Sequence, residues 1–412
     1  MRFSKISYLL FIGALLFISC KSEIKKKETD FDSLISLENP SSGNSSLPRL
    51  FAAKNELFMS WVEKKDSISV LYYSSFKDGK WIKPFVVNSG KDWFINWADF
   101  PAIAENNGNI FISHLQKSAN GKYTYDVKVN LFSSQTNTWK KDILLHTDGT
   151  ASEHGFVSVV PNGDSSFYAI WLDGRNTSGG HGDHKNSEVG AMTLRGRVVH
   201  ADGTMQPDVE LDNRVCDCCQ TAITSVHGEP VLAYRDRSET EIRDISTIGL
   251  FADSFSQSKS VYNDNWEIAG CPVNGPAISS YKDAVAIAWF TGVGDNPKVQ
   301  LAFSNNIGKT FAAPIQINSH QTLGRVDVVM VSEDTAVVSW METLGDDTFI
   351  QAMRVSADGT KGFPVTISKT SFERASGFPQ LELVGNTLYF AWTAAEVNKS
   401  SIKTASLTLA GL

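Results

Sequence analysis

Four of the five cysteines in this sequence lie in two short segments and can act together chemically. The segments are "RVCDCCQTAIT" and "GCPVNGP", and the cysteines are Cys216, Cys218, Cys219 and Cys271. In an oxidising compartment such thiols form disulfides; as thiolates they hold metal ions; left free, they are reactive. A metal site here could also include His154, or His181 and His184 from "GGHGDHK". The disulfide pairing cannot be deduced from the sequence, although one bridge is expected to reach Cys271. The only cofactor expected is a metal ion at these cysteines.

Arginines and carboxylates beside short apolar segments form a second set of chemically capable residues. A guanidinium matches a carboxylate bidentately, and paired carboxyl groups can divide the acid and base roles of glycoside hydrolysis. The candidate substrate-binding residues are Arg49, Arg175, Arg235, Arg237, Arg325 and Arg374. The candidate catalytic residues are Asp99, His154, Asp173 and Glu342. Together they predict a site for an anionic sugar, and charges that only pair with one another across a channel are the alternative.

A sevenfold repeat must position these residues. The repeated segments are "ELFMSW", "NIFISH", "SFYAIW", "EPVLAY", "DAVAIAW", "DTAVVSW" and "NTLYFAW". They end at Trp61, His114, Trp171, Tyr234, Trp289, Trp340 and Trp392. Each unit of about 50–60 residues holds four strand-like runs, which is typical of a β-propeller blade. The sequence therefore predicts an all-β fold with a single seven-bladed β-propeller; a six-bladed propeller, a β-sandwich and two β domains are the alternatives.

The ends of the chain are expected to close the ring. The last unit, Arg374 to Leu412, has room for three strands, and "SLISLEN" at Ser33 to Asn39 can supply the fourth, which removes an open edge. Because successive strands are antiparallel, the innermost strand of a blade begins on the face where the second strand ends. The charged candidates and the cysteines fall at these positions, so they should converge around one mouth of the central channel.

The N-terminus has the pattern of a bacterial lipoprotein signal. Arg2 and Lys5 precede an apolar run from Ile6 to Ile18, too short to span a bilayer comfortably, and Cys20 follows. Acylation of the Cys20 thiol would anchor the chain, whereas an ordinary secretory signal with an incidental cysteine is the alternative. The expected segments are a signal peptide at 1–19, the lipidated cysteine and a flexible tether at 20–32, and the propeller domain at 33–412.

The charge of the chain limits its partners. The formal net charge is −7, and losing Arg2 and Lys5 with the signal makes it −9 (−7 − 2). Phosphate binding needs a basic stripe, and none is visible, so no nucleic-acid partner is expected. We expect a monomer in the bacterial cell envelope, an outer-membrane lipoprotein that is periplasmic or surface-exposed and contacts the membrane through its lipid anchor only. The expected partner is an anionic glycan.

Several phrases resemble those of a known group of proteins. They are "DWFINWADFP", "EHGFVS", "WLDGR", "CDCCQTA", "YRDRSETEIRD", "GCPVNGPA" and "GRVDV". Over Leu47 to Leu412 the chain resembles bacterial β-propellers of the sialidase superfamily, in particular secreted or lipid-anchored members labelled exo-α-sialidase-like without an assigned reaction. "SNNIGKTF", Ser304 to Phe311, is similar to the Asp box of that superfamily and would be a structural turn on the face opposite the mouth.

The resemblance implies a glycosidase that binds a sialic-acid carboxylate through three arginines and uses a glutamate-activated tyrosine with an aspartic acid. The implied triad is Arg235 or Arg237, with Arg325 and Arg374; the implied acid is Asp99 or Asp173; the implied tyrosine partner is Glu63 or Glu342. The sequence departs from this pattern in having seven units rather than six, "PRL" in place of Arg-Ile-Pro, and no tyrosine at the expected mouth positions.

Two other functions remain open. Seven-bladed propellers also serve as polysaccharide lyases, for which His154, Arg175 and Arg235 are the candidates. A non-catalytic lipoprotein could instead present the mouth to a glycan or a protein. A buried carboxylate pair would favour a hydrolase, a histidine and a tyrosine beside an arginine would favour a lyase, and mutually paired charges would favour binding or structure alone.

Overall fold

A computed structural model describes residues 34–177, 190–251, 254–397 and 399–412. The predicted signal peptide, Cys20, the tether, His181 and His184 lie outside the described residues, and the expected domain boundaries stay predictions. No helix within the described ranges is long and apolar enough to cross a membrane. The propeller belongs to the compact unit Asp32–Leu412, which is one of the two units of the chain.

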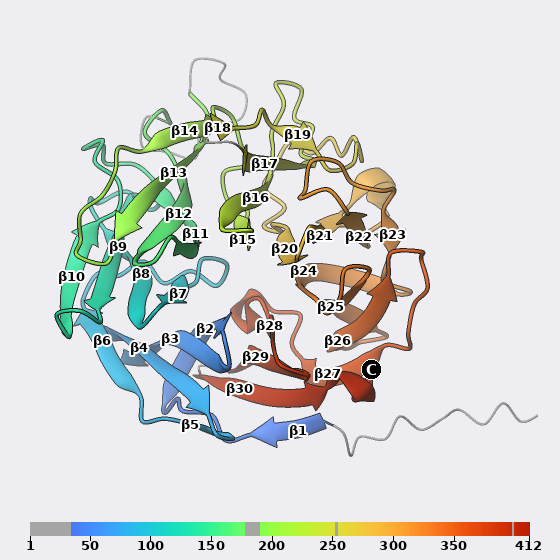
Figure 1. Cartoon of the computed structure of the whole chain (residues 1–412), viewed down its shortest axis with the longest axis horizontal. Helices are drawn as coiled ribbons and strands as arrows, with labels where there is room; N and C mark the ends of the chain where they lie inside the picture. The colour runs from blue at the N-terminus through green and yellow to red at the C-terminus, as the bar shows by residue number, and fades with distance from the viewer. Residues whose placement is uncertain (1–33, 178–189, 252–253, 398) are drawn as a thin grey trace, which may run out of the picture. The chain divides into compact units, whose positions relative to one another are not determined.

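The strands in the described part of the chain form seven antiparallel sheets around a ring, which confirms the seven-bladed propeller (Figure 1). Blade 1 contains β2 (Asn44–Ala53), β3 (Glu56–Lys65), β4 (Ile68–Lys77), β5 (Lys80–Trp81) and β6 (Phe85–Gly90). Blade 2 contains β7 (Ile103–Asn106), β8 (Asn109–Lys117), β9 (Tyr125–Ser133) and β10 (Thr138–Leu144). Blade 3 contains β11 (His154–Asn162), β12 (Ser166–Asp173), β13 (Thr193–His200) and β14 (Val209–Asp212).

The second half of the ring continues in the same order. Blade 4 contains β15 (Ala222–Val226), β16 (Glu229–Arg235), β17 (Ile245–Phe251), β18 (Ser254–Phe255) and β19 (Lys259–Ser260). Blade 5 contains β20 (Ala277–Tyr281), β21 (Ala284–Thr291), β22 (Lys298–Ser304) and β23 (Ile315–Gln316), and blade 6 contains β24 (Gln321–Met330), β25 (Thr335–Leu344), β26 (Asp347–Ser356) and β27 (Val365–Thr370). Blade 7 contains β28 (Gln380–Val384), β29 (Thr387–Glu396), β30 (Lys399–Thr408) and β1 (Leu34–Leu37). Short 3₁₀ turns are η2 (Val293–Asp295), η3 (Arg374–Ser376) and η4 (Leu409–Gly411).

The ring closes as predicted. β1 pairs antiparallel with β30, so that Leu34 lies opposite Leu407 and Leu37 opposite Thr404. The N-terminal strand thereby becomes the outer strand of the last blade. This pairing ties together segments from opposite ends of the propeller and leaves blade 7 without an unpaired β30 edge.

The hydrophobic core lies between blades. The repeat anchors Trp61, Trp171 and Trp289 have no exposed surface, and each packs against side chains of a neighbouring blade. The second strand of a blade is flanked on both sides, so its alternate residues face the adjacent blades. The regular spacing of the anchors therefore reflects stacking of blades around the axis.

The first strand of each blade begins on what we call the mouth face, and the second strand ends there. In blade 3, for example, His154 at the start of β11 lies opposite Asp173 at the end of β12. The turn after β22 falls on the opposite face. There Gly308 has a φ of +78°, and the Thr310 amide donates to Asn306 Oδ1 at 3.0 Å.

Candidate functional site

The guanidinium of Arg235, at the end of β16, donates hydrogen bonds to backbone carbonyl groups. Its guanidinium donates to the carbonyl of Asn274 at 2.9 and 2.8 Å, of Arg243 at 2.6 Å and of Phe290 at 2.7 Å. The side chain is 2 % exposed. These contacts give Arg235 a structural role between blades 4 and 5, in place of the predicted contact with a substrate or a lyase reaction centre.

Arg325, in β24, has a similar position on blade 6. Its Nη1 donates to Ser376 Oγ at 2.7 Å and to the Gly377 carbonyl at 3.0 Å, and the guanidinium lies 4.9 Å over the Trp97 ring. Burial and the nearby Arg374 lower the pKa of Arg325 to about 10. Arg325 therefore holds the segment before β28, and the implied arginine triad is not assembled around a free carboxylate site.

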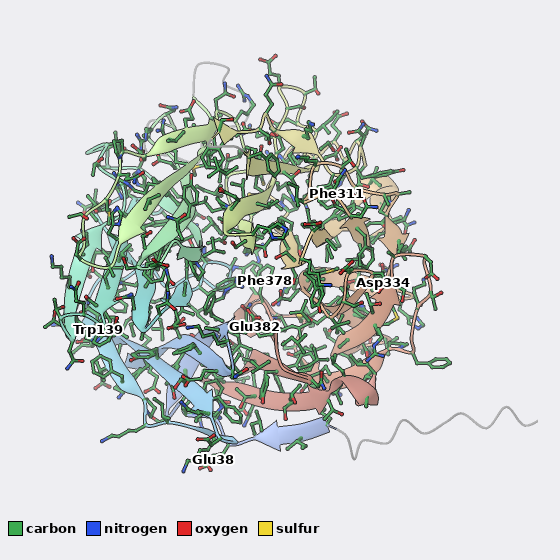
Figure 2. All side chains as sticks on the ribbon, in the orientation of Figure 1. Glu38, Trp139, Phe311, Asp334, Phe378 and Glu382 are labelled. Carbon is green, nitrogen blue, oxygen red and sulfur yellow. A yellow bond between two sulfur atoms is a disulfide. The ribbon has the colours of Figure 1, made fainter. Side chains whose placement is uncertain are left out.

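The centre of the mouth face is filled by aromatic side chains. Trp97, in the loop before β7, stacks on Phe378 with ring centroids 5.6 Å apart. Figure 2 shows Phe378 near the axis of the ring, with Glu382 from blade 7 also close to it. Aromatic side chains from the loops before β7 and β28 therefore occupy the centre of the mouth face, and Arg325 and Arg374 lie beside the Trp97 ring.

A cavity of about 520 Å³ lies along the inner strands and is lined by Arg49, Asp327 and Glu382 among others. Arg49 donates to Gln380 Oε1 at 2.8 Å. Burial raises the pKa of Asp327 to about 6 and that of Glu382 to about 8, and the Arg49 charge opposes both shifts. Arg49 therefore balances buried acids inside the channel, and its guanidinium also lies 5.5 Å from the centre of the Phe100 ring, which packs on Phe378.

The acids that end the second strands form a recurring structural element. The indole of Trp61 donates to Glu63 at 3.2 Å, and that of Trp171 donates to Asp173 at 2.8 Å. Glu342 on blade 6 accepts the backbone amides of residues 319 and 320 at 3.0 and 2.9 Å. Glu342 thus anchors a loop, as does Glu63, which accepts the Ser42 amide at 2.8 Å. These contacts give no support to the predicted catalytic role of Glu342.

Two further arginines differ in their surroundings. Arg237 pairs with Glu241 at 2.6 Å and with Asp217 at 3.3 Å, so its charge is balanced within blade 4. Arg374, in η3, is exposed and lies 5.9 Å from the centre of the Trp97 ring. Among the six predicted substrate-binding arginines, Arg374 is the one whose side chain is exposed at the mouth face.

The four cysteines come together with Arg235 and Arg243 in what we call the cysteine–arginine cluster. A disulfide joins Cys218 to Cys271, and Cys216 and Cys219 are free and buried with their sulfurs 3.2 Å apart. Arg243 donates to Cys216 Sγ at 3.3 Å. Burial opposes ionisation of Cys216, but the Cys219 hydrogen bond and the Arg243 charge outweigh it and lower the pKa of Cys216. The bridge reaches Cys271 as expected, and Cys216 and Cys219 stay free beside the Arg243 guanidinium.

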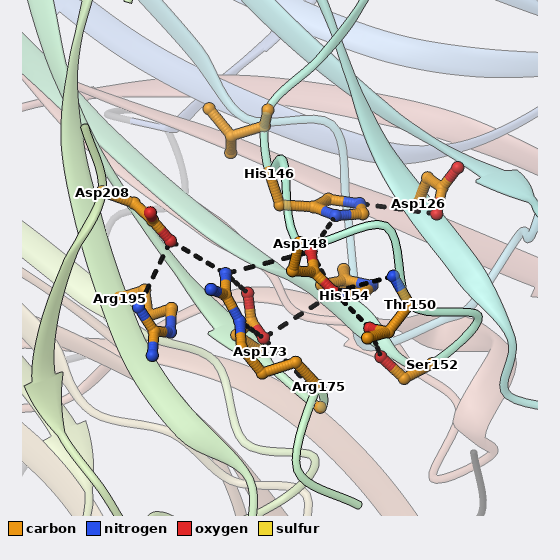
Figure 3. Close-up of polar contacts among 12 residues, drawn as sticks. Asp126, His146, Asp148, Thr150, Ser152, His154, Asp173, Arg175, Arg195 and Asp208 are labelled. Carbon is orange, nitrogen blue, oxygen red and sulfur yellow. Dashed lines mark hydrogen bonds and ion pairs between the residues drawn. The ribbon is translucent and has the colours of Figure 1, made fainter. Parts of the chain in front are cut away.

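A second group, the histidine–carboxylate cluster, lies between blades 2 and 3 (Figure 3). It consists of Asp126, His146, Asp148, His154, Asp173 and Arg175. The His146 and His154 rings stack with centroids 3.5 Å apart. Asp148 lies 2.7 Å from His146 Nδ1 and 3.3 Å from His154 Nε2. His154 contacts these groups rather than the cysteines, so the structure gives no support to a shared metal site.

The charges of the histidine–carboxylate cluster shift its pKa values in opposite directions. Burial and the neighbouring His146 lower the pKa of His154. Burial alone would raise the pKa of Asp148, yet hydrogen bonds from Thr150 and the nearby histidines hold it well below its usual range. Arg175 binds Asp173 bidentately, with both N–O distances 2.7 Å, and lowers the pKa of that carboxyl against the effect of burial. Asp173 is therefore an ionised partner of Arg175.

Next to this cluster, Tyr125 and Glu153 form a buried pair. The Tyr125 hydroxyl donates to Glu153 Oε1 at 2.6 Å. Asp99 lies against the same tyrosine: a Cβ at Gly155 would stand 2.3 Å from Asp99 Oδ2 and 3.0 Å from the Tyr125 ring. Only glycine at position 155 therefore lets this carboxyl and this ring lie side by side.

The pKa values of both carboxyl groups beside Tyr125 are raised. Burial raises the pKa of Glu153 to about 8, against the hydrogen bond from Tyr125. Burial raises the pKa of Asp99 to about 7, although Asp99 accepts the Phe156 amide at 2.8 Å. Carboxyl groups with such pKa values can donate a proton near neutral pH.

Sequence reasoning missed Tyr125 because it considered only where first strands begin and second strands end. The third strand of a blade also begins on the mouth face, and Tyr125 is the first residue of β9. The expected mouth positions were therefore incomplete, and Tyr125 lies at a position that they left out. The tyrosines at the start of "YTYDVKV" were the signal that could have located it.

The sequence matches no protein-family model, and no curated protein matches it significantly. Among solved structures, a protein of unknown function from Dyadobacter fermentans matches 91 % of this chain and 98 % of its own, at 14 % identity and a TM-score of 0.50. The polysaccharide lyase Uly1 matches 90 % of this chain and 91 % of its own, at 9 % identity and a TM-score of 0.52. The NanB sialidase from Streptococcus pneumoniae matches 92 % of this chain and 70 % of its own, at 12 % identity and a TM-score of 0.48. At these identities no residue's role is carried over to this chain.

Proposed function

We propose that this propeller is a glycoside hydrolase for anionic glycans, with Tyr125, Glu153 and Asp99 as its reaction centre. It would act in the cell envelope, held by a lipid on Cys20. The observation that carries the proposal is the 2.6 Å contact between the Tyr125 hydroxyl and Glu153 beside the raised carboxyl of Asp99. A sialidase-like reaction, implied by the sequence resemblance, requires these three side-chain types together.

The proposed chemistry uses each group once in each half of the reaction. Glu153, in the ionised form that its pKa of about 8 makes the minor one at neutral pH, takes the Tyr125 proton as the phenol oxygen attacks the anomeric carbon. Asp99 in its protonated form meanwhile protonates the departing glycosidic oxygen. The sugar is then bonded to Tyr125, and Asp99, now ionised, takes a proton from the water that displaces the tyrosine. Glu153 returns the first proton to Tyr125, so the enzyme is restored and one water is consumed.

Access to Tyr125 requires a local movement. Phe94 stacks on the Tyr125 ring with centroids 4.1 Å apart, and the tyrosine has no exposed surface. A sugar would therefore have to displace Phe94, which belongs to the loop before β7. Arg374, exposed at the same face, is the proposed partner of the sugar's carboxylate.

The deciding experiment is mass spectrometry of products after the purified full-length protein meets a panel of sialylated and uronate-containing glycans. Products that have gained one water support the hydrolase. Tyr125→Phe and Glu153→Gln should each lower kcat by about 100-fold or more, since one removes the nucleophile and the other its base. Tyr168→Phe is the matched control, because Tyr168 is a buried tyrosine of blade 3 without a hydrogen-bond partner among the described residues.

A polysaccharide lyase is the second candidate, and His154 favours it. This imidazole lies beside Tyr125, and Arg175 is the neighbouring arginine, which is the combination expected of a lyase. Unsaturated products, lost in His154→Gln and retained in Tyr168→Phe, would establish the lyase and reject the hydrolase. Recovery of every glycan intact would reject both reactions and leave a non-catalytic binding protein.

A further inference from the structure

The imidazole of His154 has one nitrogen that no described residue satisfies. Its Nδ1 lies 3.4 Å from the Tyr125 carbonyl oxygen, where an N–H can donate. Its Nε2 is buried and makes no hydrogen bond within the described part of the chain. A histidine that donates from one nitrogen to a carbonyl presents the lone pair of the other, which is the arrangement of a metal-binding histidine.

Two carboxylates face that nitrogen. Asp148 Oδ1 lies 3.3 Å from His154 Nε2, and Asp173 Oδ1 lies 3.7 Å from it. Ligand atoms that stand about 2.0–2.2 Å from a tetrahedral zinc ion are roughly 3.3–3.6 Å from one another. The two distances from His154 Nε2 are close to this range, and ligand atoms of all three residues lie within 4.8 Å of one another. All three side chains are at most 5 % exposed.

The charge of the surroundings also calls for a cation. The neighbouring carboxylates are Asp126, Asp148, Asp173, Asp208 and Glu210, and the cations paired with them are Lys128, Arg175 and Arg195. The buried Arg197 guanidinium also interacts electrostatically with Asp208, so with neutral imidazoles the sum is −1 (−5 + 4). Uncompensated charge in a buried site is costly, and a divalent cation would offset this excess.

We propose that His154, Asp148 and Asp173 bind a divalent transition-metal ion. An imidazole ligand selects metals such as Zn²⁺ over Mg²⁺ and Ca²⁺, which prefer oxygen ligands. His146 would position the site, because its Nδ1 lies 2.7 Å from Asp148 Oδ1 and its ring stacks on His154. Arg175 and the Trp171 indole would hold Asp173 from its other side. The ion would fasten the loop after β10 to blade 3, and this inference does not depend on the proposed hydrolase.

The test is a Zn²⁺ titration of the full-length protein by calorimetry after metal is removed with a chelator. Cys216→Ser/Cys219→Ser serves as the background, because the two free thiols would otherwise also bind zinc. We expect one ion per chain, and a loss of affinity of at least about 100-fold in His154→Gln, Asp148→Asn and Asp173→Asn. Loss of a residue that only orients a ligand costs about 10- to 100-fold, which is the range expected for His146→Gln.

Two matched variants make the result specific. His114→Gln removes another buried histidine, one that contacts Asn130 in blade 2, and should bind Zn²⁺ like the background protein. Asp126→Asn tests the alternative trio of Asp126, His146 and His154 and should also bind normally. The absence of stoichiometric binding in the background protein would overturn the proposal, as would loss of binding in Asp126→Asn with normal binding in Asp173→Asn.

Cobalt provides a readout that does not depend on affinity alone. Co²⁺ at the proposed nitrogen and oxygen ligands gives visible ligand-field bands without a thiolate charge-transfer band. Zn²⁺ should also raise the thermal unfolding temperature of the background protein but not that of His154→Gln, because an ion that binds only the native state stabilises it. A folded His154→Gln that keeps both signals would reject the site.

Discussion

The cysteine–arginine cluster and the histidine–carboxylate cluster both gather buried polar groups on the mouth face, but they satisfy them differently. In the first, the Arg235 guanidinium reaches three carbonyl groups, and a disulfide links blades 4 and 5. In the second, the Nε2 atoms of His146 and His154 make no hydrogen bond with any described residue. A buried polar group is normally hydrogen-bonded, so an unsatisfied set calls for an explanation.

Whether the buried polar groups are hydrogen-bonded distinguishes the structural cluster from the candidate functional cluster better than their position on the mouth face does. The same topological rule places both clusters at strand ends on one face. The Arg235 guanidinium of the cysteine–arginine cluster completes its hydrogen bonds within its own chain. The histidine–carboxylate cluster keeps buried nitrogen atoms without a hydrogen bond and an excess of negative charge. We expect changes in the cysteine–arginine cluster to alter stability, and changes around blades 2 and 3 to alter ligand and proton binding.

Replacing Arg235 should have the largest effect on stability. Arg235→Met removes the donors of three buried carbonyls, and such a loss costs about 3–5 kcal/mol. Urea unfolding followed by tryptophan fluorescence would measure the free energy of unfolding. A cost below about 1 kcal/mol would mean that other donors replace the guanidinium, and the contrast between the two clusters would fail.

The seven blades and the ring closure were predictable because they rest on local patterns. Alternating apolar residues and the buried anchors recur along the chain, and "SLISLEN" supplied a strand that the last blade lacked. The partners of Arg325 were not predictable, because they lie about 50 residues away in the loop around Ser376. His146 and Asp148 also escaped prediction, since they lie in an inter-blade loop that carries no motif. Tyr125 was missed through incomplete use of strand direction, which is a correctable error.

Removing the Cys218–Cys271 disulfide should have the second largest effect. The bridge closes a loop of 53 residues in sequence separation, and a loop of this size gives about 2–4 kcal/mol through the lost freedom of the unfolded chain. Cys218→Ser/Cys271→Ser should therefore lower the free energy of unfolding by that amount. A reductant should destabilise the wild-type protein and leave the double variant unchanged; equal sensitivity of both proteins would contradict the assignment of the bridge.

The carboxyl groups beside Tyr125 should make stability fall as the pH rises. The native pKa values of Asp99 and Glu153, about 7 and about 8, lie above the ordinary values of 3.8 and 4.5. The native state therefore binds these protons more tightly than the unfolded state, so the stabilisation is complete below about pH 4 and is lost as the pH approaches 8. The shift of Asp173 is in the opposite direction, so its contribution is lost in acid.

Urea unfolding at several pH values between about 5 and 8 would check this sign. We expect the free energy of unfolding to fall across the window, and we expect Asp99→Asn/Glu153→Gln to reduce the fall by about 1–3 kcal/mol. Part of the slope should remain, because burial also raises the pKa values of Asp327 and Glu382 in the channel. A slope that is the same in the variant and the wild type would show that neither carboxyl is protonated in the native protein.

Arg374 should give the smallest change in stability and still affect ligand binding, which completes the contrast with Arg235. Its side chain is exposed, so Arg374→Met should change the free energy of unfolding by no more than about 0.5 kcal/mol. If this guanidinium pairs with a sugar carboxylate, the same variant should bind an anionic glycan about tenfold more weakly, because one exposed charged contact of about 1.4 kcal/mol corresponds to that factor. Lys80→Met is the matched control, since it removes an exposed positive charge on the opposite face. Equal weakening by both variants would show that the net charge of the protein, rather than Arg374, governs attraction of the glycan.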